Sequence, residues 1–248
     1  MLLLPQSLKQ LSLRTNKKIM KGILTITVLL ALFSISGFSQ NSVKNPGTND
    51  PAARKILDGV TAKFKTYNTV KADFVLQIEN AAGKIQGTKK GTAYMKGNQY
   101  KVELTDQEIF CNAQKIWTYD KNANEVQVSK FDPGGDSFTP QKIFTNFYEK
   151  DFLYKLNGEK KDGGKTLQEI ELTPTDKNKA FFKILVFVDK ATKNIVSTRL
   201  FEKNGNRYLY KVTSFIPNTK IDNSFFVFNT AKHPDVEVIF LQCGAISG

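Results

Sequence analysis

The sequence has few of the residue types from which catalytic and metal sites are built. Its 248 residues include one His, one Trp and two Cys. A single His excludes a His-rich metal site, and a hydrolase with a Ser/His/Asp set would have to use His233. Two Cys cannot form a disulfide scaffold. No Gly-rich segment has the spacing of a phosphate-binding loop. The sequence therefore favours a binding protein over an enzyme, and we expect no catalytic residue, no metal and no cofactor.

What the chain does contain is typical of a folded protein. Hydrophobic residues make up 40% of it and charged residues 24%, which excludes bulk disorder and collagen. Phe alone contributes 19 residues. Such a number of large aromatic side chains needs either a substantial core or an apolar surface that binds something.

Residues 1–39 are predicted to be a secretory signal peptide, with Met20 as an alternative start. Lys17, Lys18 and Lys21 precede an apolar run over 23–33, and Gly37 and Ser39 have the small side chains that signal peptidases prefer. The alternative interpretation, an uncleaved membrane anchor, needs roughly 20 consecutive apolar residues. We therefore expect cleavage before residue 40. No Cys follows the run, so the mature chain is not lipidated there and should be soluble.

Removal of the signal peptide changes the charge of the protein. It takes away five basic residues and no acidic one, and so lowers the net charge from +13 to +8. Export argues against nucleic acid as a partner, and the remaining Lys residues are scattered along the chain. They indicate a solvated, basic surface.

The mature chain predicts one large antiparallel sheet with few helices. Residues 40–49 are a flexible tail. Asp50 and Pro51 begin an amphipathic helix over 51–66. Strands with a period of two follow over residues 73–79, 91–96, 99–104, 108–111, 115–119, 125–128, 152–156, 167–172, 181–188, 195–202 and 208–215, with a last one near 226–228. Gly158 is expected to mark a turn, and 242–248 a tail.

The sheet is interrupted by a segment with helical spacing over 139–148. It carries Ile143, Phe144, Phe147 and Tyr148 on one side, and should cover an apolar surface. Two interpretations of the aromatic excess remain open: the rings fill an ordinary core, or the sheet curves around an apolar cavity. Cys111 and Cys243 could pair after export, but their surroundings favour two free thiols.

The order of these segments resembles the LolA family, the periplasmic outer-membrane lipoprotein carriers. The resemblance rests on the strand over 91–96, the run over 109–120 with its Ile116-Trp117-Thr118-Tyr119 segment, and Thr139-Pro140 before the apolar helix. The closing segment over 226–230 and the later Val236 and Val238 add to it. The resemblance implies an α+β fold in a single domain over residues 50–241. In this fold a large curved antiparallel sheet of about 11 strands forms a half-open barrel, and helices cover its apolar cavity.

The resemblance also implies a role and a site. Family members take acylated lipoproteins from an inner-membrane ABC-type release complex and carry them, as monomers, across the periplasm of a Gram-negative bacterium, with or without an outer-membrane receptor. The residues expected to contact the acyl chains are Phe74, Tyr100, Val102, Ile109 and Trp117 of the sheet and Ile143, Phe144 and Phe147 of the lid. Where the family usually has Arg-Pro, this chain has Lys96 followed by Gly97, so Lys96 is expected to tether the lid. A lipid- or lipoprotein-sensing module, or a secreted hydrolase, is the alternative function.

Overall fold

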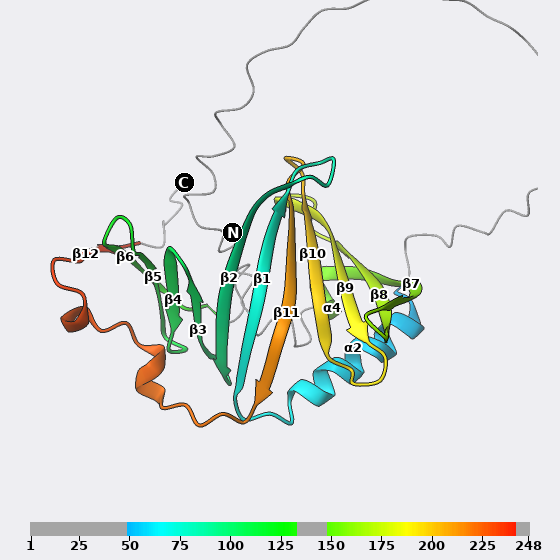
Figure 1. Ribbon diagram of the computed structural model, residues 1–248, viewed down its shortest axis with the longest axis horizontal. Helices are drawn as coiled ribbons and strands as arrows, with labels where there is room; N and C mark the ends of the chain where they lie inside the picture. Colours follow the sequence, from blue (N-terminus) through cyan, green and yellow to red (C-terminus); the bar gives the residue numbers. More distant parts are fainter. Residues whose placement is uncertain (1–48, 133–147, 242–248) are drawn as a thin grey trace, which may run out of the picture. The chain divides into compact units, whose positions relative to one another are not determined.

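The computed structural model describes residues 49–132 and 148–241, which belong to one compact unit. Twelve strands form one sheet in the order β12-β6-β5-β4-β3-β2-β1-β11-β10-β9-β8-β7 (Figure 1). All neighbours are antiparallel except β12, which runs parallel to β6. The large, curved, open antiparallel sheet predicted from the sequence is confirmed, with twelve strands where about eleven were expected.

The strands and helices have the following bounds. The strands are β1 (Val70–Glu79), β2 (Ile85–Lys96), β3 (Gln99–Leu104), β4 (Gln107–Cys111), β5 (Lys115–Asp120), β6 (Glu125–Lys130), β7 (Phe152–Asp162), β8 (Lys165–Pro174), β9 (Phe181–Asp189), β10 (Ile195–Glu202), β11 (Arg207–Pro217) and β12 (Glu237–Phe240). The helices are α2 (Pro51–Phe64), the short α4 (Tyr148–Asp151) and two 3₁₀ turns, η1 (Asn223–Phe226) and η2 (Thr230–Lys232).

Helix α2 begins as the sequence predicts and packs on one side of the sheet. The Asp50 side chain accepts a hydrogen bond from the Ala52 N–H at 2.8 Å, and its second oxygen accepts one from the Leu156 N–H of β7 at 3.0 Å. The same carboxylate thus caps the helix and holds it against the sheet. The helix buries a stripe made of Ala53, Ile56, Leu57, Val60 and Thr61.

Strand β1 joins the two halves of the sheet. Strands β1 to β6 form one meander and β7 to β11 another, and β1 pairs with β11 from Val70 opposite Pro217 to Glu79 opposite Arg207. The register shifts once, between Asp73 and Phe74. The chain then leaves β11 and returns along the first meander to place β12 beside β6 (Figure 1).

The pairing register sorts every side chain to one of two faces. The face on which α2 packs, here called the helix face, carries a buried row across the second meander: Tyr154, Leu172, Ile184, Leu200 and Tyr208. Tyr154 contacts Tyr148, whose hydroxyl donates to Asp58 of α2 at 2.7 Å. The core of this half therefore lies between the sheet and its two helices. The other side is called the outer face.

Two sequence predictions about the strands are wrong. The segment over 226–228 is not a strand. It begins at the end of the 3₁₀ turn η1 over 223–226, where the Asp222 side chain accepts from the Ser224 N–H at 2.9 Å and turns the backbone. The last strand is β12. Gly158 does not end a strand either. It lies inside β7 at a shift in register, with a φ of 136° that only Gly adopts readily.

Other predictions fall on residues outside those described. These are the signal peptide over 1–39, the tail over 40–48, the helical segment up to residue 147 and the tail over 242–248. Cys111 is described: it is buried and carries a free thiol, and burial raises its pKa.

Candidate functional site

The helix face continues across the first meander as an apolar surface. Five residues from neighbouring strands lie directly opposite one another and form what we call the central row: Phe215 of β11, Ala72 of β1, Ala93 of β2, Val102 of β3 and Ile109 of β4. Four inter-strand steps of roughly 4.8 Å make the row about 19 Å long. Side chains on both sides of it are apolar too, so the row belongs to a continuous apolar region of the sheet. Ala72, Ala93 and Ile109 are buried, and Val102 and Phe215 are half-buried.

On one side of the central row lies a row that contains Tyr100. It runs through Val70, Met95, Tyr100, Cys111 and Ile116, all of which are buried. The Tyr100 hydroxyl has no hydrogen-bond partner in the described part of the chain. Burial, with a smaller contribution from Cys111, raises the pKa of Tyr100 well above its usual value. The hydroxyl is therefore protonated and neutral, in keeping with the apolar character of this face.

Phe74 lies on the other side of the central row, and Gly91 makes its position possible. Gly91 is directly opposite Phe74 in the pairing of β1 with β2. A Cβ atom built at Gly91 would lie 2.5 Å from Cζ of Phe74 and 2.8 Å from the Glu103 carbonyl oxygen. The ring thus fills the space over the backbone where a side chain is missing. It remains partly exposed on the helix face.

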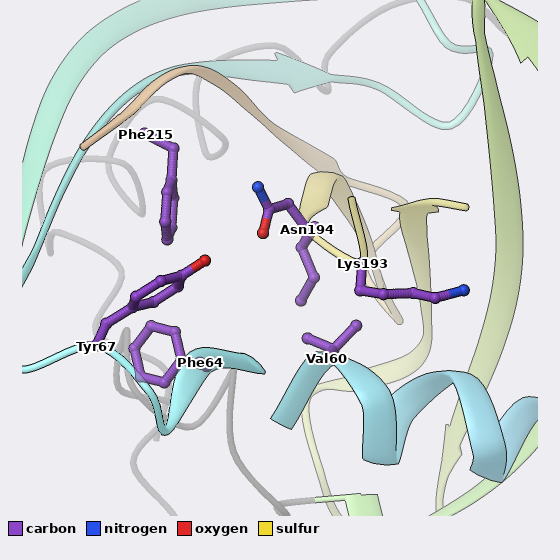
Figure 2. A pocket seen from close by; sticks show the side chains of 7 residues that line it. Val60, Phe64, Tyr67, Lys193, Asn194 and Phe215 are labelled. Carbon is purple, nitrogen blue, oxygen red and sulfur yellow. The ribbon is translucent and has the colours of Figure 1, made fainter. Parts of the chain in front are cut away.

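A small hollow adjoins the central row where α2 ends. It holds about 210 Å³, part of it open to solvent, and is lined by Val60, Phe64, Tyr67, Lys193, Asn194, Ile195 and Phe215. Figure 2 shows the rings of Phe64, Tyr67 and Phe215 close together, while the Lys193 ammonium points away. Only about 10 Å³ of it is enclosed space, far less than in a usual ligand pocket of roughly 300–1,000 Å³. Its Phe215 also begins the central row, so the two apolar surfaces are continuous.

The register separates the sheet residues named from the sequence into two groups. Phe74, Tyr100, Val102 and Ile109 share the helix face. Trp117 does not, because it lies opposite Phe110 and Val128 on the outer face. There it packs against a buried cluster of Phe110, Tyr119, Val126 and Phe228. Of the predicted lid residues, Ile143, Phe144 and Phe147 lie outside the described residues.

Lys96 is also on the outer face, and its contacts are with the segment after β11. Its ammonium donates to the Ile221 carbonyl at 3.1 Å and to Oδ1 of Asn223 at 2.7 Å. In the described part of the chain Lys96 thus holds the segment that leads to η1.

His233, the one candidate for a hydrolase, lies in the same outer-face cluster. Its ring stacks on Phe228 with centroids 4.5 Å apart and an angle of 17° between the planes, and it contacts Tyr119 at 4.6 Å. The structure therefore gives His233 a packing role. Within residues 49–132 and 148–241, no three His, Cys, Asp or Glu side chains gather as a metal ion requires.

Sequence reasoning missed part of the apolar surface. Ala72 and Ala93 are too small to attract notice, and their place in the central row depends on the pairing of β1, β2 and β3. Phe64 and Tyr67 continue the apolar stripe of α2 beyond the buried part of the helix. That continuation is the one signal in the sequence that could have pointed to the hollow.

An open antiparallel sheet with one continuous apolar face and a helix packed on that face defines a class of single-sheet, half-open proteins. Within that class, the chain belongs to the family of the outer membrane lipoprotein carrier protein LolA, whose family model matches residues 65–229. The resemblance inferred from the sequence is thereby confirmed. In the part of the chain that the structure describes, no helix has the length and apolar character needed to cross a membrane.

Two relatives and one solved structure illustrate the similarity. The outer-membrane lipoprotein carrier protein of Cupriavidus necator is 29% identical over 194 residues, covering 75% of this chain and 89% of the relative. That of Legionella pneumophila strain Lens is 21% identical over 212 residues, covering 84% and 96%. The crystal structure of an uncharacterized conserved protein from Thermus thermophilus has a TM-score of 0.52 at 13% identity, and covers 77% of this chain and 99% of that one. This likeness concerns the fold.

Proposed function

We propose that the protein is a periplasmic lipoprotein carrier that binds acyl chains along the helix face of its sheet. The observation that carries the proposal is the central row, which leads without a polar break from Phe215 beside the hollow to Ile109 on β4. Phe74 and Tyr100 flank the row, and Val102 lies in it. These are the acyl contacts we propose in the described sheet. Trp117 is left out because it belongs to the outer face.

The proposed ligand suits the surface in length and in chemistry. A row about 19 Å long is comparable with an extended fatty acyl chain. Each buried methylene contributes roughly 0.8 kcal/mol, so about fifteen of them give a gross gain on the order of 10 kcal/mol. Part of that gain is offset by the ordering of the chain. Because the sheet is open, the ligand can leave sideways to an acceptor that binds it more tightly.

The name of the relatives, outer-membrane lipoprotein carrier protein, supports lipoproteins as cargo and the outer membrane as destination. The inner-membrane complex, the receptor and the monomeric state are predictions from the resemblance. The chain would be exported, receive lipoproteins from an inner-membrane ABC-type complex, and deliver them as a monomer to the outer membrane or a receptor there. It would do so as a binding protein, without catalysis. Lid contacts by Ile143, Phe144 and Phe147 remain predictions from the resemblance.

The experiment that tests binding uses the protein purified from the periplasm of an expression host and an apolar fluorescent probe. A triacylated lipopeptide should displace the probe, whereas the same peptide without acyl chains should not. Val102→Asp, which places a charge in the central row, should abolish displacement. Thr88→Asp is the matched control, because Thr88 is exposed on the outer face of the same meander. Circular dichroism checks that both variants fold.

Two outcomes would overturn the proposal or redirect it. If neither peptide displaces the probe, or if both variants lose binding equally, the helix face is not an acyl site. A second assay then asks whether the loaded protein passes lipopeptide to outer-membrane vesicles. Binding without transfer would assign the protein to the alternative class of lipid-sensing modules.

A further inference from the structure

The outer face of the second meander carries an ordered array of cations and apolar side chains. Three rows of directly opposed residues cross β9, β10, β11 and β1 there. We call them together the cationic face. The first row is Lys183, Phe201, Arg207 and Glu79, and the second is Leu185, Arg199, Leu209 and Gln77. The third row is Phe187, Ser197, Lys211 and Val75, and Lys90 of β2 extends it. No described helix packs on this face, since α2 and α4 lie on the other side.

Two basic groups of the cationic face, and a third beside it, are held over aromatic rings. The Lys183 ammonium lies 4.5 Å from the Phe201 ring centroid, and the Arg207 guanidinium lies 5.4 Å from it on the neighbouring strand. A third cation, Lys160 of β7, lies 3.8 Å from the Phe187 ring. Such contacts keep the stems of the cations on the sheet and their charges in a layer above it.

The positive charge of this layer is only partly neutralised. Arg199 pairs with the nearly buried Glu79 at 3.3 Å. On β8 the second and third rows continue into Glu171 and Glu169, which pair with Lys155 and Lys160 of β7 at 3.4 and 3.7 Å. Among the described residues, no carboxylate forms an ion pair with Lys90, Lys183, Arg207 or Lys211. These four cations thus have no ion-pair partner among the described residues, and they lie on one face of the five adjacent strands from β9 to β2. Their mutual repulsion is relieved when an anionic partner covers them.

An exposed aromatic ring lies beside the cations. Phe182 belongs to β9 and has no residue opposite it on β10, because the pairing register shifts there. Its side chain is 48% exposed. Its ring contacts Phe201 with centroids 6.1 Å apart, and the Lys183 ammonium lies 6.0 Å from its centroid. A phenyl group flanked by cations is the combination that peripheral proteins insert between lipid headgroups.

We propose that the cationic face docks the protein on a bilayer surface containing anionic phospholipid. The cations would meet the headgroup phosphates, and Phe182 would enter the interface between them. A bilayer fits better than an acidic protein for two reasons. The charges are spread over adjacent strands on flexible Lys and Arg stems, whereas tight protein partners need fully desolvated pockets. A fluid headgroup layer adapts to such a surface without shape complementarity.

Docking by this face leaves the helix face free. The two faces are opposite sides of the same sheet, so a docked protein would keep its apolar row and the hollow turned away from the lipid. The protein could therefore wait at a membrane and meet a partner there without exposing its acyl site to the bilayer. The docking itself does not depend on what the helix face binds.

The test measures co-sedimentation of the exported, purified protein with vesicles at low salt. Vesicles of phosphatidylcholine with a quarter phosphatidylglycerol should bind the protein, and pure phosphatidylcholine vesicles should not. The double variant Lys183→Gln/Lys211→Gln should weaken binding by roughly 25-fold, since each cation near an anionic surface contributes about fivefold. Phe182→Ser should also weaken it. The double variant Lys55→Gln/Lys150→Gln removes the same charge from α2 and α4 and should leave binding unchanged.

Three results would overturn the proposal. The first is a failure to bind anionic vesicles at an ionic strength of about 50 mM, where screening is weak. The second is an equal loss in both double variants, which would mean that net charge alone attracts the protein. The third is binding to polyglutamate but not to vesicles, which would assign the face to an acidic protein. Val102→Asp, which tests the acyl site, should bind vesicles like the unmodified protein.

Discussion

Gly91 of β2 offers a sharp test of how the helix face is packed. We expect Gly91→Ala to destabilise the protein although it adds only one methyl group. That methyl carbon would lie 2.5 Å from Cζ of Phe74, 2.8 Å from Cδ2 of Leu104 and 2.8 Å from the Glu103 carbonyl oxygen. The two side chains can move aside, but the carbonyl belongs to the neighbouring strand and is fixed by its pairing with β2.

The size of the effect follows from comparison with a second Gly in the same strand. A Cβ atom at Gly87 would meet only Cδ1 of Ile78, at an ordinary 3.8 Å. Gly87→Ala should therefore stabilise the protein by about 0.4–1 kcal/mol, because it restricts the unfolded chain. Overpacking in a fixed site costs about 1–3 kcal/mol, so Gly91→Ala should be less stable than the unmodified protein by roughly that amount.

Urea denaturation followed by circular dichroism measures both variants on the same protein. The two substitutions are chemically identical and lie four residues apart in one strand, so helix or strand propensity cannot separate them. A double variant with Phe74→Leu should recover only part of the loss, since the contact with the Glu103 carbonyl oxygen remains. If Gly91→Ala is as stable as Gly87→Ala, the close approach of Phe74 and Glu103 to the Gly91 backbone is refuted.

Three further predictions concern other parts of the sheet. Phe228→Ala should lower the free energy of unfolding by about 3–5 kcal/mol in urea titration, because the ring is buried in the outer-face cluster; a loss below about 1 kcal/mol would contradict this packing. Lys96→Met should hasten proteolysis after β11, because the ammonium no longer holds the Asn223 side chain; an unchanged cleavage rate counts against the tether. Burial raises the pKa of Asp189, but hydrogen bonds, chiefly from the Thr192 N–H, lower it by more. Its stabilisation is thus present above the unfolded pKa of about 3.9 and is lost as the pH falls through the lower folded value. Asp189→Asn should cost most stability near neutral pH, and the cost should shrink as the pH falls through the lowered pKa of Asp189; a pH-independent loss would refute this.

The strands themselves could be read from the sequence because their signals are local. Alternating apolar residues bounded by Gly, Asn and Asp define β3 over 99–104 and β10 over 195–202 with the bounds that the structure shows. Helix α2 was equally visible, since Asp50 and Pro51 mark its start and its buried residues recur at helical spacing. Neither signal requires knowledge of a distant partner.

The face of Trp117 could not be read in this way. Within one strand, alternation shows which residues share a face, but it does not say which face of the next strand continues it. The turn after Cys111 places Ile116 opposite Cys111 and Trp117 opposite Phe110. Shortening or lengthening that turn by one residue would reverse the result. Trp117 therefore lies on the outer face, whereas Ile109 lies on the helix face.

The last strand was missed for a related reason. Phe226 and Phe228 alternate as strand residues do, but they belong to a segment that turns at Asp222, and both rings are buried there, that of Phe228 in the outer-face cluster. Strand β12 forms only because β6 lies beside it, in the single parallel pair of the described sheet. Its four residues carry little signal of their own, and pairing with a strand about 110 residues earlier supplies the rest.

The union of β1 with β11 has a consequence for how the protein folds. Each meander consists of neighbours in sequence and can form quickly, but the residues paired across this union are about 130 to 150 positions apart. Closing so long a loop is slow in comparison with hairpin formation. We therefore expect each meander to form before the two join, as a half-sheet with an open edge at β1 or β11. Until these two edges pair, they are the part of the sheet most prone to aggregate.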